Sequence, residues 1–119
     1  MKQYTTPEQT SKLMELGFEK PKNTQYVQRV KARNLHSPFI EFGEPAFEGS
    51  YTIGELIEML PQEINSEALP NRFRVYPDHY KKWKVDYSNI WGELYSTYRT
   101  ELIDALYDMC VKLKDEGVV

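Results

Sequence analysis

The chain has 119 residues, of which 40% are hydrophobic and 28% charged, and its formal net charge is −3. This length suits one domain, residues 1–119, with enough buried surface to fold without metal or disulfide, and an aromatic content of 13% excludes a typical disordered chain. With a single cysteine, no leader peptide and no apolar run of about 20 residues, the chain is expected to be cytoplasmic, without a membrane partner.

The N-terminal segment predicts a short helix. Thr6 can cap the free amides, Pro7 suits the first helical position, and Gln9 can complete a capping box with Thr6. Gly17 supplies the stop signal at the C-terminal end.

The next segment predicts two short strands. Tyr26–Val30 and Phe39–Phe42 have the residue types of strands, with a turn predicted between them at residues 34–38. Glycine and proline at residues 43–49 then predict a loop.

The clearest helix signal follows residue 51. Thr52 can cap this helix, Glu55 completes its capping box, and Pro61 ends it. A turn-rich region is predicted at residues 62–71. The apolar residues of the helix recur at helical spacing; they are Ile53, Leu56, Ile57 and Leu60.

A β-hairpin is predicted next. Apolar and charged residues alternate in Arg72–Tyr76 and again in Lys82–Tyr87, with turn chemistry at Pro77–Asp78. A third strand is predicted around Trp91–Tyr95, after a turn at Ser88–Asn89. Alternation separates two faces. The expected buried face holds Phe73, Val75, Trp83 and Val85, and the expected outer face holds Arg72, Arg74, Lys82 and Lys84.

The last helix is predicted to start near Thr100 and to end at Gly117. Its expected buried stripe consists of Leu102, Ile103, Leu106, Cys110 and Leu113. Three helices flanking a small, mostly antiparallel sheet of three to five strands indicate an α+β layered sandwich.

No familiar catalytic or metal motif is present. His36 and His79 lie in predicted turns and lack the spacing of a zinc site. Cys110 lies on an apolar stripe, where cysteine most often serves as a small core residue. We therefore assign no catalytic residue and no metal ligand.

Two carboxylate pairs occur at helical spacing, Glu55 with Glu58 and Asp104 with Asp108. Both pairs lie off the apolar stripes, so we interpret them as solvated helix faces rather than as acid/base groups. The six glycines form no phosphate-binding loop, and no cofactor is expected.

The candidate functional feature is the basic and aromatic hairpin at residues 72–84. Paired as predicted, its arginines would lie opposite lysines, and like charges opposite each other destabilise a sheet. Negative charge that offsets this repulsion could come from Asp86 or Glu93, from the acidic block at residues 34–71, or from an external anion such as a phosphate backbone. The candidate anion- or partner-binding residues are Arg72, Arg74, Tyr76, Tyr80, Lys82 and Lys84.

The layout also resembles that of small uncharacterised proteins encoded by phages and prophages of gut bacteria, and the phage α-β-α sandwich domain. The resemblance covers residues 50–119 and is carried by Tyr51–Pro61, the strand with Trp83, and the segment from Glu101 to Gly117. It implies a mobile-element origin and an α/β sandwich, and it transfers no active-site residue.

Three functions follow as expectations. The first is a non-enzymatic accessory or interaction protein of a phage-like or mobile element, with a protein partner or a homo-oligomer. The second is a nucleic-acid-binding module that uses the 72–84 hairpin, although the sequence pI of 5.4 is low for such a module. The third is an enzyme without a recognisable motif, which requires a deep pocket lined by titratable groups.

Overall fold

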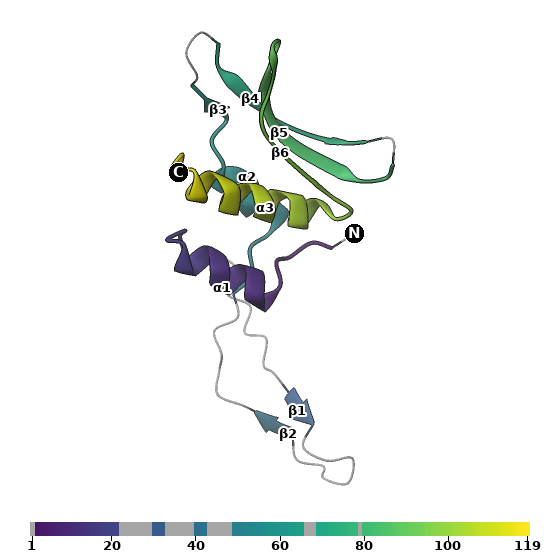
Figure 1. Cartoon of the computed structure of the whole chain (residues 1–119). Coiled ribbons are helices and arrows are strands. Elements are labelled where there is room, and N and C mark those ends of the chain that lie inside the picture. Colours follow the sequence, from purple (N-terminus) through teal and green to yellow (C-terminus); the bar gives the residue numbers. More distant parts are fainter. Residues whose placement is uncertain (1, 22–29, 33–39, 43–48, 66–68, 79) are drawn as a thin grey trace.

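The structure is a computed structural model that describes residues 2–21, 30–32, 40–42, 49–65, 69–78 and 80–119. Within these ranges, three helices and a four-stranded antiparallel sheet form the α+β layout that the sequence predicts (Figure 1). Strands β1 (Val30–Ala32) and β2 (Ile40–Phe42) form a separate antiparallel pair. The predicted strand residues 26–29, the turn at 34–38, the loop residues 43–48 and both histidines lie outside the described residues.

Helix α1 (Pro7–Glu15) starts as predicted because its capping box forms. The hydroxyl of Thr6 accepts the amide of Gln9 at 3.2 Å, and the Gln9 side chain accepts the amide of Thr6 at 3.0 Å. Gly17 ends the helix in the left-handed region, with φ of 98°. This conformation lets the amide of Phe18 donate to the carbonyl of Leu13 at 3.1 Å, so the chain turns back onto the helix.

Helix α2 (Ile53–Met59) confirms the second capping box, since Thr52 and Glu55 exchange the two predicted hydrogen bonds. Helix α3 (Leu102–Asp115) contributes the largest part of the core. No helix in the described part of the chain combines the length and the apolarity needed to cross a membrane. The fully or nearly fully buried side chains of α3 are Leu102, Ile103, Ala105, Leu106, Met109, Cys110 and Leu113.

The sheet has the strand order β3-β4-β5-β6. Its strands are β3 (Glu63–Ile64), β4 (Asn71–Pro77), β5 (Trp83–Asn89) and β6 (Gly92–Arg99). β3 falls in the region predicted as turns, because two residues are too few to show an alternating pattern.

The predicted turn at Ser88–Asn89 is wrong, because β5 continues to Asn89 and the chain reverses at Ile90 and Trp91. Two local features explain why the turn forms at Ile90 and Trp91. The side chain of Asn89 accepts the amide of Trp91 at 2.8 Å, and Gly92 adopts a φ of 140° that side chains rarely allow. Trp91 therefore lies in the turn rather than in the third strand.

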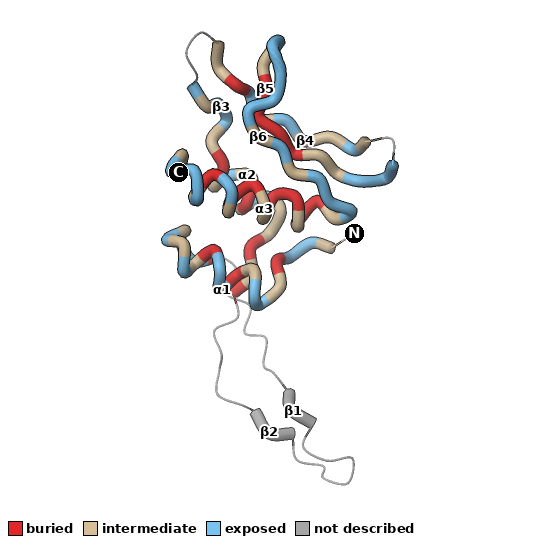
Figure 2. The backbone as a smooth tube through the Cα atoms, viewed as in Figure 1, coloured by how far each residue is buried: buried red, intermediate tan, exposed pale blue. Residues whose placement is uncertain are grey.

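The elements form layers. Helix α3 packs against β5 and β6, α2 packs beside α3, and α1 lies on the side of α3 away from the sheet (Figure 1). Buried residues concentrate along α3 and the centre of β5 (Figure 2). The predicted inner face of the sheet is confirmed: Val85 is fully buried, and Phe73, Val75 and Trp83 pack against the core.

Candidate functional site

The opposite face of the sheet, which we call the open face, is covered by no helix in the described ranges (Figure 1). Strand register gives this face three cross-strand pairs: Arg72 with Ser88, Arg74 with Asp86, and Tyr76 with Lys84. The predicted opposition of arginines and lysines is therefore wrong. Its cause is the position of the hairpin closure: the strands close at Pro77 and Trp83, one residue later on each strand than predicted, so Lys82 lies outside the ladder.

Asp86 forms the centre of the open face. Its side chain is 0% exposed, although it lies on a face without a covering helix. One carboxylate oxygen accepts Nε of Arg74 at 3.1 Å and the hydroxyl of Ser88 at 3.0 Å. The other accepts Nη2 of Arg74 at 3.3 Å and the hydroxyl of Tyr76 at 2.9 Å. These bonds fix both the guanidinium and the phenol above the sheet.

The remaining cations of the open face also have acidic partners. The ammonium of Lys84 donates to Glu93, and this bond raises the pKa of Lys84. Nε of Arg72 lies 3.8 Å from a carboxylate oxygen of Glu63. The sequence leaves open three sources of negative charge that could offset these cations. Two of them contribute to the open face: the acids of the sheet itself, and the acidic block at residues 34–71 through Glu63.

One end of the open face is hollowed. A cavity of about 430 Å³ lies between the guanidinium-bearing side chains of Arg72 and Arg74 and the turn after β5. Its remaining lining combines polar and apolar residues; it consists of Ser88, Asn89, Leu69, Pro70 and Ile90. An anionic group beside an apolar side chain matches this combination.

Large apolar side chains are exposed at the turn between β5 and β6, which adjoins this cavity. Ile90 is 85% exposed and Trp91 is 72% exposed. Leu94, in the irregular part of β6, is also exposed. A tryptophan and an isoleucine at one turn form a larger apolar protrusion than single scattered residues do.

Tyr80 and Lys82 lie outside the strands, in the loop between β4 and β5. Lys82 places its ammonium 5.2 Å from the centroid of the Tyr98 ring. The hydroxyl of Tyr98 donates to Asp78, and this bond raises the pKa of Tyr98 to about 12. Arg72, Arg74, Tyr76 and Lys84 thus lie on the strands of the open face, whereas Tyr80 and Lys82 belong to the loop, where Lys82 reaches the ring of Tyr98, the cross-strand partner of Lys84.

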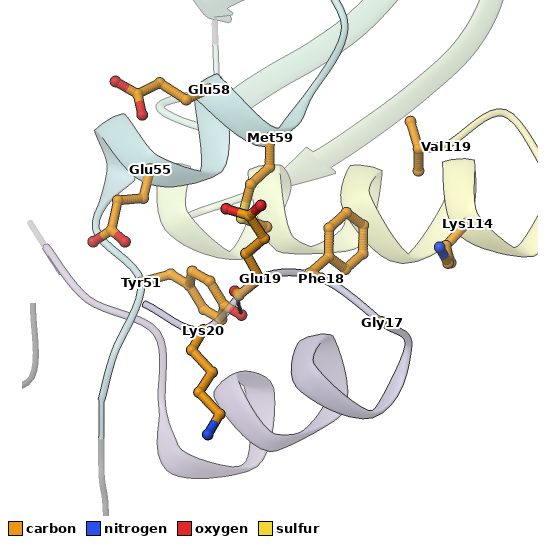
Figure 3. A pocket seen from close by; sticks show the side chains of 10 residues that line it. All are labelled: Gly17, Phe18, Glu19, Lys20, Tyr51, Glu55, Glu58, Met59, Lys114 and Val119. Carbon is orange, nitrogen blue, oxygen red and sulfur yellow. Dashed lines mark hydrogen bonds between the residues drawn. The ribbon is translucent and has the colours of Figure 1, made fainter. Parts of the chain in front are cut away.

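A second cavity, of about 490 Å³, lies among the ends of α1, α2 and α3 (Figure 3). Phe18, Tyr51 and Met59 lie at its centre, while the carboxylates of Glu55 and Glu58 point away from each other (Figure 3). The hydroxyl of Tyr51 donates to the carbonyl of Glu19, and burial raises the pKa of Tyr51 to about 12. This cavity has no motif in the sequence, because its lining comes from three separate helix ends.

The predicted core role of Cys110 is confirmed. The thiol is fully buried, and burial raises its pKa to about 12. In the described ranges, no group of three histidine, cysteine or acidic residues is placed to hold a metal ion.

The prediction that Asp104 lies on a solvated helix face is wrong. It accepts hydrogen bonds from Lys2 at 3.1 Å and from Gln9 at 2.8 Å. Burial acts to raise its pKa, but these bonds and the nearby charges of Lys2 and Arg99 outweigh it, so the pKa is lowered. The carboxylate ties the N-terminal segment to the first turn of α3.

No family model matches this chain, and no curated protein or solved structure is detectably similar to it.

Proposed function

We propose that the protein is a non-enzymatic interaction module whose open face binds a partner protein. The partner segment that fits carries a carboxylate beside an apolar side chain. The carboxylate pairs with Arg72 and Arg74 in the 430 Å³ cavity, and the apolar side chain contacts Ile90. Trp91, at the neighbouring turn, extends the contact.

The observation that carries this proposal is the buried carboxylate of Asp86. It holds Arg74 and Tyr76 in fixed positions before any partner arrives. Ordering long side chains on binding costs about 0.5–1.5 kcal/mol each, so side chains that are already fixed bind at a lower entropic cost. Arg74 stays 54% exposed despite this restraint, which leaves its free edge for a second carboxylate.

The residue types of the surface support the same function. Tryptophan, tyrosine and arginine are the side chains that most often dominate the energy of protein interfaces. The open face and its adjoining turn present all three as Trp91, Tyr76 and Arg74.

Nucleic-acid binding by the hairpin is the weaker alternative. A phosphate backbone is attracted by uncompensated positive charge. On the open face, Arg74 pairs with Asp86 and Lys84 with Glu93, so the face lacks the several uncompensated cations that a run of phosphates requires, whereas a single carboxylate needs only the outer edge of one guanidinium. The resemblance to phage and prophage proteins adds the prediction that this interaction module belongs to a phage-like or mobile element.

Selection from a displayed library of random peptides tests the proposal. We expect peptides enriched on the immobilised protein to share an acidic residue next to an apolar one. Arg74→Gln should weaken their binding by about 10-fold or more, because one desolvated charge pair contributes at least ~1.4 kcal/mol. Arg99→Gln, which removes a cation outside the open face, is the matched control and should leave binding unchanged.

Two results would contradict the proposal. One is a selected peptide family that binds the Arg74→Gln variant as tightly as the unaltered protein. The other is tight binding of a labelled single-stranded oligonucleotide that weakens steeply with salt, since that result assigns the face to nucleic acid.

A further inference from the structure

The edge of the sheet at β6 is long and unpaired within the described part of the chain. β6 runs from Gly92 to Arg99 and has β5 as its single neighbour in the sheet. Such an edge presents a row of free backbone amides and carbonyls, and proteins commonly blunt it with proline or lysine. β6 contains neither residue.

The hydrogen-bonding pattern shows which backbone groups point outward. The amide of Phe73 donates to Gln62 at 3.0 Å, on the side of β4 away from β5. Phe73 and Tyr87 are therefore a non-hydrogen-bonded pair, and the backbone groups of Tyr87 point toward its partner Tyr95 in β6. Because this pattern alternates along a strand, Thr97 also bonds inward, and the backbone groups of Ser96 and Tyr98 point outward.

A second copy of β6 complements this edge in one antiparallel register. Centring a two-fold axis on Thr97 pairs Ser96 with Tyr98 of the other copy, twice, so the outward groups of both strands meet. Thr97 then faces its own counterpart, and Thr–Thr pairs are favourable in sheets. Arg99 faces the ring of Tyr95 in the other copy, a cation against an aromatic face.

The flank of α3 next to this edge is compatible with the same arrangement. A groove of about 440 Å³ lies between β6 and α3, and its lining includes the apolar parts of Tyr107 and Val111. Its charged lining consists of Lys112 and three acids, Asp108, Asp115 and Glu116. The two-fold axis sets the two copies of α3 antiparallel, so the Lys112 of each copy lies toward the acids of the other and offsets part of their repulsion.

We propose that two copies of the chain associate through β6, forming one continuous eight-stranded antiparallel sheet with the helices on one side. The contact uses the sheet edge and the flank of α3, so it leaves both open faces accessible. It is independent of the partner proposed for the open face.

Sedimentation equilibrium of the full chain from micromolar to millimolar concentration tests this dimer. The unaltered protein should approach twice the mass of one chain. Ser96→Pro removes an outward amide without removing a bond to β5, and it should sediment as a single chain with unchanged circular dichroism. An unaltered protein that remains a single chain at all concentrations would overturn the proposal, and so would a Ser96→Pro variant that dimerises as strongly.

Cysteine cross-linking tests the register in a Cys110→Ser background. Thr97→Cys places the two sulfurs across the two-fold axis, where the strand spacing permits a disulfide. Ser96→Cys, one residue away and on the other face of the sheet, is the matched control. We expect mild oxidation to cross-link the Thr97→Cys protein several times faster. Equal or faster cross-linking of the Ser96→Cys protein would contradict the register and the symmetric dimer with it.

Discussion

Replacing Asp86 with asparagine tests whether the Asp86 carboxylate organises the open face. The carboxylate is fully buried and accepts four hydrogen bonds from Arg74, Tyr76 and Ser88. Asparagine has nearly the same shape but keeps one acceptor oxygen, so its amide group must face two of these donors. The substitution therefore removes two charge-assisted bonds and sets donor against donor.

The expected loss of stability depends on how many of the lost hydrogen bonds water can replace. Hydrogen bonds to charged groups contribute about 1.5–3 kcal/mol each to stability. Arg74 is 54% exposed, so water can take over part of its bonding, whereas the Ser88 hydroxyl is buried. We therefore expect Asp86→Asn to lower the free energy of unfolding by about 2–3 kcal/mol, just below the range of about 3–5 kcal/mol for broken buried ion pairs.

Urea unfolding followed by tryptophan fluorescence measures this loss. For a slope of about 1–3 kcal/mol per molar urea, the midpoint should fall by roughly 0.7–3 M. Glu93→Gln, which alters a partly exposed carboxylate on the same face, is the control and should cost below about 1 kcal/mol. If Asp86→Asn unfolds within ~0.5 kcal/mol of the unaltered protein, the carboxylate does not organise this face.

Three further outcomes are expected. Thr52→Ala removes the cap of α2 and should cost about 1 kcal/mol in urea unfolding, whereas Ser50→Ala, two residues earlier, should cost little. The raised pKa of Cys110 makes stability fall as pH rises from 9.0 toward about 12, since the unfolded thiol loses its proton first; Cys110→Ala should flatten part of this loss in pH-dependent unfolding. The lowered pKa of Asp104 makes stability fall as pH drops below 3.8, since the unfolded carboxyl takes up a proton first; an Asp104→Asn protein with unchanged acid sensitivity would refute the contribution of that carboxylate.

The helices follow from local chemistry, and this is why the sequence predicts them well. Each capping box is complete within four residues, as with Thr6 and Gln9, and the stop at Gly17 needs no distant contact. The inner face of the sheet is equally accessible to prediction, because alternation fixes it once Val85 is buried.

The candidate site is harder to predict, because it depends on strand register. Alternation assigns Arg74 to the open face, but the residue opposite depends on where the hairpin closes, which is at Pro77 and Trp83. Closing the hairpin one residue earlier on each strand, at Tyr76 and Lys82, would place Lys84 instead of Asp86 opposite Arg74. The helix-end cavity around Tyr51 depends on tertiary packing of three helices and leaves no local signal in the sequence.

The open face, organised by Asp86, is the binding surface of the proposed function. The most direct measurement is the amide chemical-shift map of the isotope-labelled protein as a selected peptide is added. We expect the largest shifts at Arg72, Arg74, Ser88 and the turn at Ile90 and Trp91, with a smaller response in the Asp86→Asn protein. Shifts confined to α1 and the helix-end cavity, with the open face unmoved, would contradict the account.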